Sequence, residues 1–119
     1  MEDLDEAISQ ERAALALRPE GHPNRSSSLA NLAASLRTRF SHDGAVEDLE
    51  ESISLERAAL DLRPEGHRDH SASLGNLSNS LWMRFTRGGQ MKDLEEAISL
   101  NRVALELRPE GHQIGRAHV

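Results

Sequence analysis

Residues 48–67, with the sequence DLEESISLERAALDLRPEGH, decide the fold because the chain carries this stretch three times. The first copy spans residues 3–22 (DLDEAISQERAALALRPEGH), and the last spans residues 93–112 (DLEEAISLNRVALELRPEGH). The copies begin 45 residues apart, and 26 of 45 positions are identical when residues 3–47 are aligned with residues 48–92. Self-similarity at a fixed period indicates a repeat protein, in which one structural unit is copied along the chain.

The repeated stretch has the pattern of a helix that is buried on two sides. Its apolar residues fall on two neighbouring helical stripes. Acidic residues occupy the first turn and Arg63 the last, as the helix dipole favours. Pro64 then ends the helix, because it lacks a backbone N–H and disfavours the helical conformation of the residue before it. The two stripes consist of Leu49, Ile53 and Leu60, and of Leu55, Ala59 and Leu62.

A second helix is predicted in the other half of the period. Residues 26–40 (SSSLANLAASLRTRF) and 71–85 (SASLGNLSNSLWMRF) place leucines at helical spacing. The serines that start both segments are expected to cap these helices, and the glycines at 44 and 88–89 are expected to end them. The unit is thus an αα-hairpin, and the fold class is all-α. The five predicted helices span residues 3–17, 26–41, 47–62, 71–86 and 92–107.

Composition narrows the class of protein. The chain has 119 residues, a formal net charge of −6 and no cysteine. The acidic balance argues against general nucleic-acid binding, and the lack of cysteine excludes a disulfide framework and thiolate metal sites. The N-terminus lacks the apolar core of a signal peptide, and no apolar run approaches the length of a membrane span. We therefore expect a soluble, cytoplasmic protein with neither nucleic acid nor membrane as a partner.

The period also defines the domain organisation. It gives two whole units, residues 3–47 and 48–92, and a partial third unit, residues 93–112. Both ends fall inside a repeat, so we expect a fragment of a longer array whose first and last helices lack an outer neighbour. Such uncovered helices predict self-association. Residues 113–119 (QIGRAHV) match the translation of a common sequencing adapter and are expected to be a non-native or disordered tail. A short natural tail is the alternative.

Small residues, leucines and a closing proline recur at fixed places in the units. They are Asn31, Leu32, Ala33, Leu36, Ala7, Ala14 and Pro19, then Asn76, Leu77, Leu81, Ser52, Ala59 and Pro64, and finally Ala97, Ala104 and Pro109. This pattern resembles the tetratricopeptide repeat, specifically the long variant of kinesin light chains and of arrays in large fungal and bacterial signalling proteins. The resemblance covers residues 3–112. The 45-residue unit is longer than the usual 34, and Glu11, Glu56 and Asn101 stand where the family usually has an aromatic residue.

The resemblance implies a right-handed superhelix of stacked hairpins, an αα-hairpin solenoid. In this family the Ser-Leu-Asn-Leu helices line a concave groove that binds an extended peptide or a partner helix. On these helices the groove face should carry Ser27, Ala30, Asn31, Ala34, Arg37 and Thr38, and in the second unit Ala72, Gly75, Asn76, Asn79, Trp82 and Met83. Of these twelve, the predicted peptide-binding residues are Asn31, Ala34, Arg37, Thr38, Asn76, Asn79, Trp82 and Met83.

Two kinds of side chain carry this prediction. Asn31 and Asn76 each offer a donor and an acceptor, which match a peptide backbone unit of any sequence. Related repeats use asparagine at this place to hold the main chain of the ligand; a structural hydrogen bond between helices is the alternative. Trp82 is the only tryptophan of the chain and is a candidate hot spot. Packing of Trp82 against a neighbouring repeat is its alternative.

Charge is segregated along the sequence. Residues 22–42 contain three arginines and no acidic residue, whereas residues 43–65 contain eight acidic residues and two arginines. A groove lined by the basic segment should favour an acidic peptide over a basic one. The alternative is a solvated face that only maintains solubility.

No motif supports catalysis or a cofactor. The serines have no neighbouring base, so they do not indicate a nucleophile. His67 and His70 give two ligands where zinc requires three or four, and the periodic histidines His22, His67 and His112 indicate a shared role in the loops. We therefore predict a non-enzymatic protein-interaction scaffold without metal or cofactor. The alternative is a regulatory or spacer segment of a larger signalling protein that contains a caspase-like protease or a nucleotide-binding switch domain.

Overall fold

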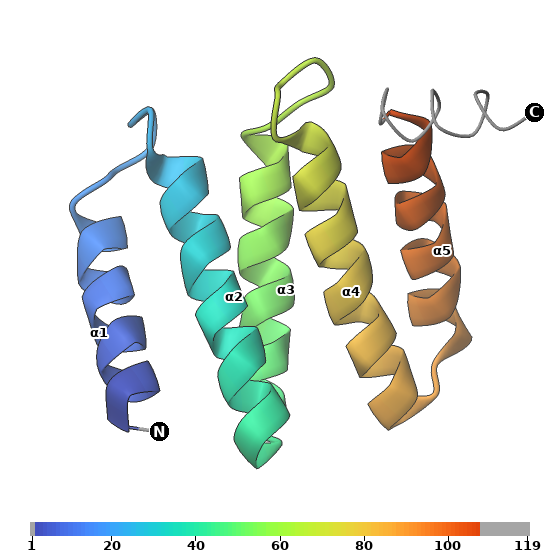
Figure 1. Cartoon of the computed structure of the whole chain (residues 1–119), viewed down its shortest axis with the longest axis horizontal. Helices are drawn as coiled ribbons and strands as arrows, with labels where there is room; N and C mark the ends of the chain where they lie inside the picture. Colours follow the sequence, from blue (N-terminus) through green and yellow to red (C-terminus); the bar gives the residue numbers. More distant parts are fainter. Residues whose placement is uncertain (1, 108–119) are drawn as a thin grey trace, which may run out of the picture. The chain divides into compact units, whose positions relative to one another are not determined.

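The computed structural model describes residues 2–107, and this part of the chain forms five α-helices (Figure 1). The chain forms two compact bodies, which we call the N-terminal body (Met1–Leu62) and the C-terminal body (Arg63–Val119). Within residues 2–107 there is no strand, and no helix is long and apolar enough to cross a membrane. The all-α prediction is confirmed, and each helix begins and ends within two residues of its predicted bounds. The helices are α1 (Glu2–Ala16), α2 (Arg25–Asp43), α3 (Val46–Asp61), α4 (His70–Gly88) and α5 (Met91–Glu106).

Glycine ends the two longest helices, as predicted. Gly44 after α2 and Gly89 after α4 adopt φ angles of 73° and 72°, in the left-handed region. Their backbone N–H groups donate to the carbonyls of Phe40 and Phe85, at 2.7 and 2.6 Å. Only glycine enters this conformation without a steric cost, so these positions fix where the chain turns into the next helix.

In the N-terminal body, α2 packs against α1 on one side and more extensively against α3 on the other (Figure 1). Ile8 of α1 forms a buried cluster with Leu32 and Leu36 of α2, and three partly buried leucines pack against this cluster. Leu49 of α3 is 1% exposed. The leucines of α2 therefore contact two helices at once, which explains why all three leucines and Phe40 of this helix are buried.

The described part of the C-terminal body is a hairpin of α4 and α5, whose helices pack as extensively as α2 and α3 do. Its core contains the leucines of α4 and the alanines of α5. Small residues on α5 let the two helix backbones approach each other. The buried apolar residues are Leu74, Leu77, Leu81, Ala97 and Ala104.

The expected serine caps are wrong. Asn24 and Asp69 precede α2 and α4, and neither makes a side-chain capping hydrogen bond. The helices begin before the serines, which lie within the first turn. Buried serines there receive hydrogen bonds from arginines of the preceding loop: Arg18 donates to Ser28 at 2.6 Å, and Arg63 donates to Ser73 at 3.0 Å.

The prediction that Arg63 lies in the last turn of α3 is wrong. Arg63 lies beyond the end of α3 and is 6% exposed, so it anchors the loop to α4 and does not complement the dipole of α3. The predicted tail, residues 113–119, and the end of the partial third unit lie outside the described residues. Handedness of the repeat array stays a prediction.

Candidate protein-interaction site

The predicted face of α2 is largely open to solvent. Asn31, Ala34 and Thr38 are all exposed and follow one another at spacings of three and four residues, so they share one helix face. Ser27 is also exposed and Ala30 is half-buried. The Thr38 hydroxyl donates to the Ala34 carbonyl at 2.9 Å, within its own helix. Asn31 is therefore the residue of this face whose side chain is best suited to recognise a peptide backbone.

Arg37 lies at the edge of this face and is committed to α3. Its guanidinium donates to a carboxylate oxygen of Glu56 at 2.7 Å. The Glu56 side chain is only 4% exposed and that of Arg37 is 22% exposed, so the ion pair is largely shielded from water. A ligand on α2 therefore does not meet an isolated arginine here.

The equivalent face of α4 contains the most exposed aromatic ring of the described chain. Trp82 is 51% exposed and contacts Phe85 one turn along the helix, with ring centroids 5.7 Å apart. Asn79 is exposed, whereas Met83 and Asn76 are half-buried. Asn76 takes part in an interaction within the protein, and its predicted role in binding stays a prediction. Ala72 is exposed and Gly75 is half-buried.

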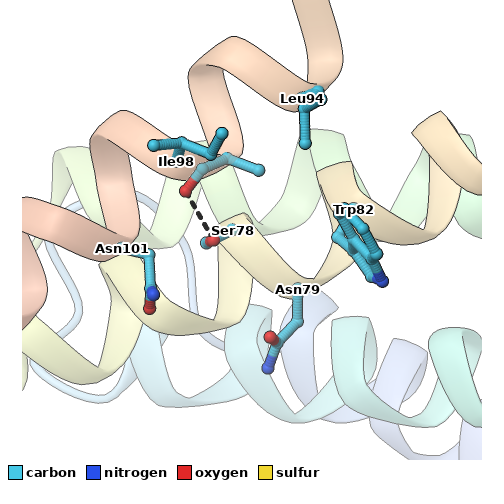
Figure 2. Close-up of a pocket in the computed structure, with 7 residues that line it drawn as sticks. Ser78, Asn79, Trp82, Leu94, Ile98 and Asn101 are labelled. Atoms are coloured by element: carbon cyan, nitrogen blue, oxygen red, sulfur yellow. Dashed lines mark hydrogen bonds between the residues drawn. The ribbon is translucent and has the colours of Figure 1, made fainter.

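A pocket of about 290 Å³ opens between α4 and α5 and includes two of the predicted residues (Figure 2). Asn79 and Trp82 enter it from α4, and leucine, isoleucine and asparagine side chains enter it from α5. The Ser78 hydroxyl donates to the Ala97 carbonyl at 2.7 Å, so this donor is already used in a hydrogen bond between α4 and α5. The lining residues are Ser78, Asn79, Trp82, Leu94, Ala97, Ile98 and Asn101.

The contribution of α5 to this pocket was missed by the sequence analysis. A signal was present, because Asn101 follows Glu56 by one period and breaks the acidic pattern of that position. Trp82 likewise follows Arg37 by one period. The two members of the ion pair in the N-terminal body are therefore both replaced in the C-terminal body, and the replacements line one pocket.

A second ion pair holds each hairpin together and is repeated with the period. Arg39 of α2 makes two hydrogen bonds to Asp48 of α3, at 2.8 and 2.9 Å, and Arg84 of α4 makes two to Asp93 of α5, at 3.1 and 3.0 Å. The hydrogen bonds from Arg39 hold the pKa of the Asp48 carboxyl below its ordinary value. Arg39 also donates to Asp5 of α1, at 3.1 Å.

These pairs change the charge available to a ligand. The segregation of charge along the sequence predicted a basic groove. In the structure, Arg37 and Arg39 are both paired with carboxylates. Arg25 donates to the backbone carbonyl of Arg18 at 2.7 Å. The charges of two of the three arginines of residues 22–42 are thus offset by carboxylates, so this segment is less basic than its sequence indicated.

The periodic histidines have the loop role that the sequence indicated. His22 and His67 each accept a hydrogen bond at Nδ1 from the backbone N–H two residues later, Asn24 and Asp69, both at 3.0 Å. His70 contacts the Arg63 carbonyl through Nδ1, at 2.6 Å. No group of three or more potential metal ligands occurs in the described part of the chain. His112 lies outside it.

Comparison with known proteins gives one match. Residues 25–71 match the family model of the tetratricopeptide repeat. The matched segment contains α2, α3 and the loop to α4, which is the hairpin with the Arg37–Glu56 pair. The resemblance is confirmed for this segment, and tetratricopeptide repeats are scaffolds that generally mediate protein–protein interaction. The kinesin-light-chain-like or fungal subtype stays a prediction. No significant match was found among curated proteins or solved structures.

Proposed function

We propose that the chain is a protein-interaction scaffold, in which α2 and α4 each offer an exposed face to a peptide or partner segment. The observation that carries the proposal is Trp82, whose large ring is half exposed beside the exposed amide of Asn79. Tryptophan is enriched among the residues that dominate binding energy at interfaces, and burial of its ring by a partner is strongly favourable. The match to an interaction repeat supports the same function.

An exposed asparagine supplies the polar part of each face. Asn31 on α2 and Asn79 on α4 are both exposed, and each carboxamide can donate to a peptide carbonyl and accept from a peptide N–H. Such contacts fix the main chain of a ligand without regard to its sequence. Because Arg37 and Arg39 of α2 are paired with carboxylates, the proposal includes no preference for an acidic partner.

The test begins with selection of peptides from a random phage-displayed library against the full chain. A selected peptide is synthesised and titrated by calorimetry against the natural protein and against Asn31→Ala, Asn79→Ala and Trp82→Ala. We expect Trp82→Ala to weaken binding at least tenfold and each asparagine change to weaken it severalfold. Ser54→Ala, on the exposed face of α3, is the matched control and should bind normally. Selected peptides that bind all four variants equally well would refute the proposed site.

A further inference from the structure

Helix α1 occupies the same repeat position as α3 and α5 but lacks a neighbour that both of them have. The three helices lie in the three copies of the repeated stretch. α3 packs extensively against the preceding α2, and α5 packs extensively against the preceding α4. Of the described helices, only the following one, α2, packs extensively against α1 (Figure 1). The face that α3 and α5 turn toward a preceding helix is therefore open on α1.

This face is buried on α3 and partly open on α1. Its four residues on α1 follow one another at spacings of three and four, so they share one side of the helix. The first of them is exposed and the other three are half-buried, whereas all four counterparts on α3 are buried. We call this surface the outer face of α1. It consists of Asp3, Ala7, Glu11 and Ala14, whose counterparts on α3 are Asp48, Ser52, Glu56 and Ala59.

On α3, both carboxylates of this face are paired with arginines of the preceding helix. Arg37 donates to Glu56 at 2.7 Å, and Arg39 donates twice to Asp48, at 2.8 and 2.9 Å. The second of these pairs recurs between α4 and α5 in the C-terminal body. In both hairpins, therefore, the helix that covers this face supplies arginine to an acidic residue.

On α1 the two carboxylates of the outer face have no such partner. Oε1 of Glu11 is inaccessible to water and accepts no hydrogen bond. Oε1 of Glu56 is in the same situation, but the other oxygen of Glu56 accepts from Arg37. Within residues 2–107, neither Asp3 nor Glu11 makes an ion pair. The outer face thus holds two negative charges without compensation, one of them partly withdrawn from water, which is unfavourable until a cation arrives.

The only arginine within α1 cannot supply that cation. Arg12 donates to both carboxylate oxygens of Glu51 on α3, and this contact raises the pKa of the guanidinium above its ordinary value. Compensation must therefore come from outside the described helices.

The shape of the outer face indicates a helix as the source of this charge. Ala7 and Ala14 are small, so the backbone of another helix can approach closely, as α2 approaches α3 at Ser52 and Ala59. The helix that covers these counterparts carries its two arginines one residue apart, at positions 37 and 39. A ligand for the outer face should therefore be an amphipathic helix with the same arginine spacing.

A second copy of the chain does not provide such a helix. Residues 37–39 are the only place in the sequence where two arginines are separated by one residue. Both of these arginines are already paired with carboxylates of α3. The helix that fits the outer face therefore belongs to a different protein.

We propose that the outer face of α1 docks a helix of a partner protein that carries two arginines separated by one residue. The helix runs antiparallel to α1, as α2 runs to α3, and its arginines pair with Glu11 and Asp3. The inference goes beyond the proposed function, because it concerns a different helix and depends on charge, whereas the faces of α2 and α4 depend on asparagine and tryptophan.

The test uses the full chain and a fluorescein-labelled peptide with the sequence of residues 24–45, which contains all of α2. This peptide is the probe because its sequence fits the corresponding face of α3 in the structure. Fluorescence anisotropy should show saturable binding, and the peptide with Arg37→Gln and Arg39→Gln should bind at least tenfold more weakly. Absence of binding, or equal binding of the two peptides, would overturn the proposal.

Variants of the protein locate the binding. Asp3→Asn with Glu11→Gln should weaken binding of the natural peptide at least tenfold, and circular dichroism should show an unchanged fold, because neither carboxylate has a partner. Glu47→Gln with Asp61→Asn removes the same charge at exposed positions of α3 and should bind normally. Unchanged affinity in the α1 variant would overturn the proposal, since the peptide would then be replacing α2 in its own place against α3.

Exchange of charge tests the pairing itself. Glu11→Arg in the protein should weaken binding of the natural peptide and restore binding of a peptide with Arg37→Glu. Failure of this restoration would contradict the assigned pair. Sedimentation equilibrium of the full chain without peptide examines the remaining occupant. A dimer that dissociates in Asp3→Asn with Glu11→Gln would overturn the proposal, because a second copy would then cover the outer face. None of these results depends on Asn31, Asn79 or Trp82, so the proposed function is tested separately.

Discussion

Arg37 of α2 donates to Glu56 of α3 at 2.7 Å, and this ion pair joins the two helices that pack most extensively in the N-terminal body. Glu56 is 4% exposed, so its carboxylate depends on the arginine for compensation. One period later the corresponding residues are Trp82 and Asn101, which carry no charge. The repeat can therefore be built with or without an ion pair at this position. Removal of one partner should destabilise the protein much more than replacement of both.

The first prediction follows from this asymmetry. Arg37→Ala should lower the free energy of unfolding, by up to about 3–5 kcal/mol, because it removes a positive charge that compensates the buried Glu56 carboxylate. The double variant Arg37→Trp with Glu56→Asn has the residues found at these positions in the C-terminal body. It should lower the free energy of unfolding clearly less than Arg37→Ala does, because no charge remains buried. Urea denaturation followed by circular dichroism measures both. A double variant as unstable as Arg37→Ala would show that the alternative arrangement does not transfer between repeats.

The second prediction concerns a hydrogen bond that is reversed between the two hairpins. In the N-terminal body the Ser52 hydroxyl of α3 donates to the Ala33 carbonyl of α2 at 2.9 Å. In the C-terminal body the direction is opposite, from Ser78 of α4 to Ala97 of α5. The hydrogen bond between the two helices is thus present in both hairpins, but the serine that donates it lies on the other helix.

Ser52→Ala should therefore destabilise the protein by about 0.5–1.5 kcal/mol, the usual net contribution of one such hydrogen bond. Ala33→Ser together with Ser52→Ala should restore most of the loss, because it reproduces the arrangement of the C-terminal body. Thermal denaturation of the three proteins provides the measurement. The argument fails if the added serine deepens the loss, since the helix spacing at Ala33 would then be too small for a hydroxyl.

Whether the sequence predicts a contact between two helices depends on whether both of its residues recur with the 45-residue period. The helices were predictable because leucine spacing, Pro64 and Gly44 each have a direct physical effect on the backbone. The Arg39–Asp48 pair has a repeated counterpart, so its two residues could have been paired from the period. The Arg37–Glu56 pair has none, and nothing in its spacing distinguishes it from exposed charges.

The pocket was harder to predict for a related reason. Its walls come from both helices of a hairpin, and the sequence analysis assigned ligand binding to one helix only. Which side chains of α5 face α4 depends on helix rotation, which a stripe of apolar residues constrains only approximately. The serine caps were wrong because Arg63 is buried and Arg18 half-buried, and these two loop residues donate hydrogen bonds to Ser73 and Ser28.

The third prediction compares two glycines in the same hairpin. Gly89 has a φ of +72°, and Gly75 lies inside α4; a methyl group added at either position would meet nothing within 4 Å. Gly89→Ala should destabilise by about 1–2 kcal/mol, because an L-residue is strained in the left-handed region. Gly75→Ala should stabilise by about 0.5–1 kcal/mol, because alanine loses less backbone entropy in a helix. The melting temperature should fall in Gly89→Ala and rise in Gly75→Ala. Shifts of the same sign in the two variants would contradict the prediction.

The fourth prediction concerns pH and the Arg39–Asp48 pair. The hydrogen bonds from Arg39 lower the pKa of Asp48 in the folded protein, so folding favours the ionised carboxylate. Its stabilising contribution is then fully present above the pKa of an unfolded aspartate, near 3.8, and is lost as the pH falls through the lower folded value. Asp48→Asn removes the charge, and we expect it to lower the free energy of unfolding by about 1.5–3 kcal/mol at pH 7.

Other carboxylates also titrate in acid, so the informative quantity is the difference between the natural protein and Asp48→Asn. Urea denaturation at pH 7, 5, 4 and 3 should give a constant difference down to about pH 4 and a shrinking difference below it. Asp61→Asn, at an exposed position of α3, is the control whose difference should stay small throughout. A difference between natural protein and Asp48→Asn that persists unchanged at pH 3 would mean that the ion pair does not favour the charged form, and that Asp48 stabilises the hairpin by packing alone.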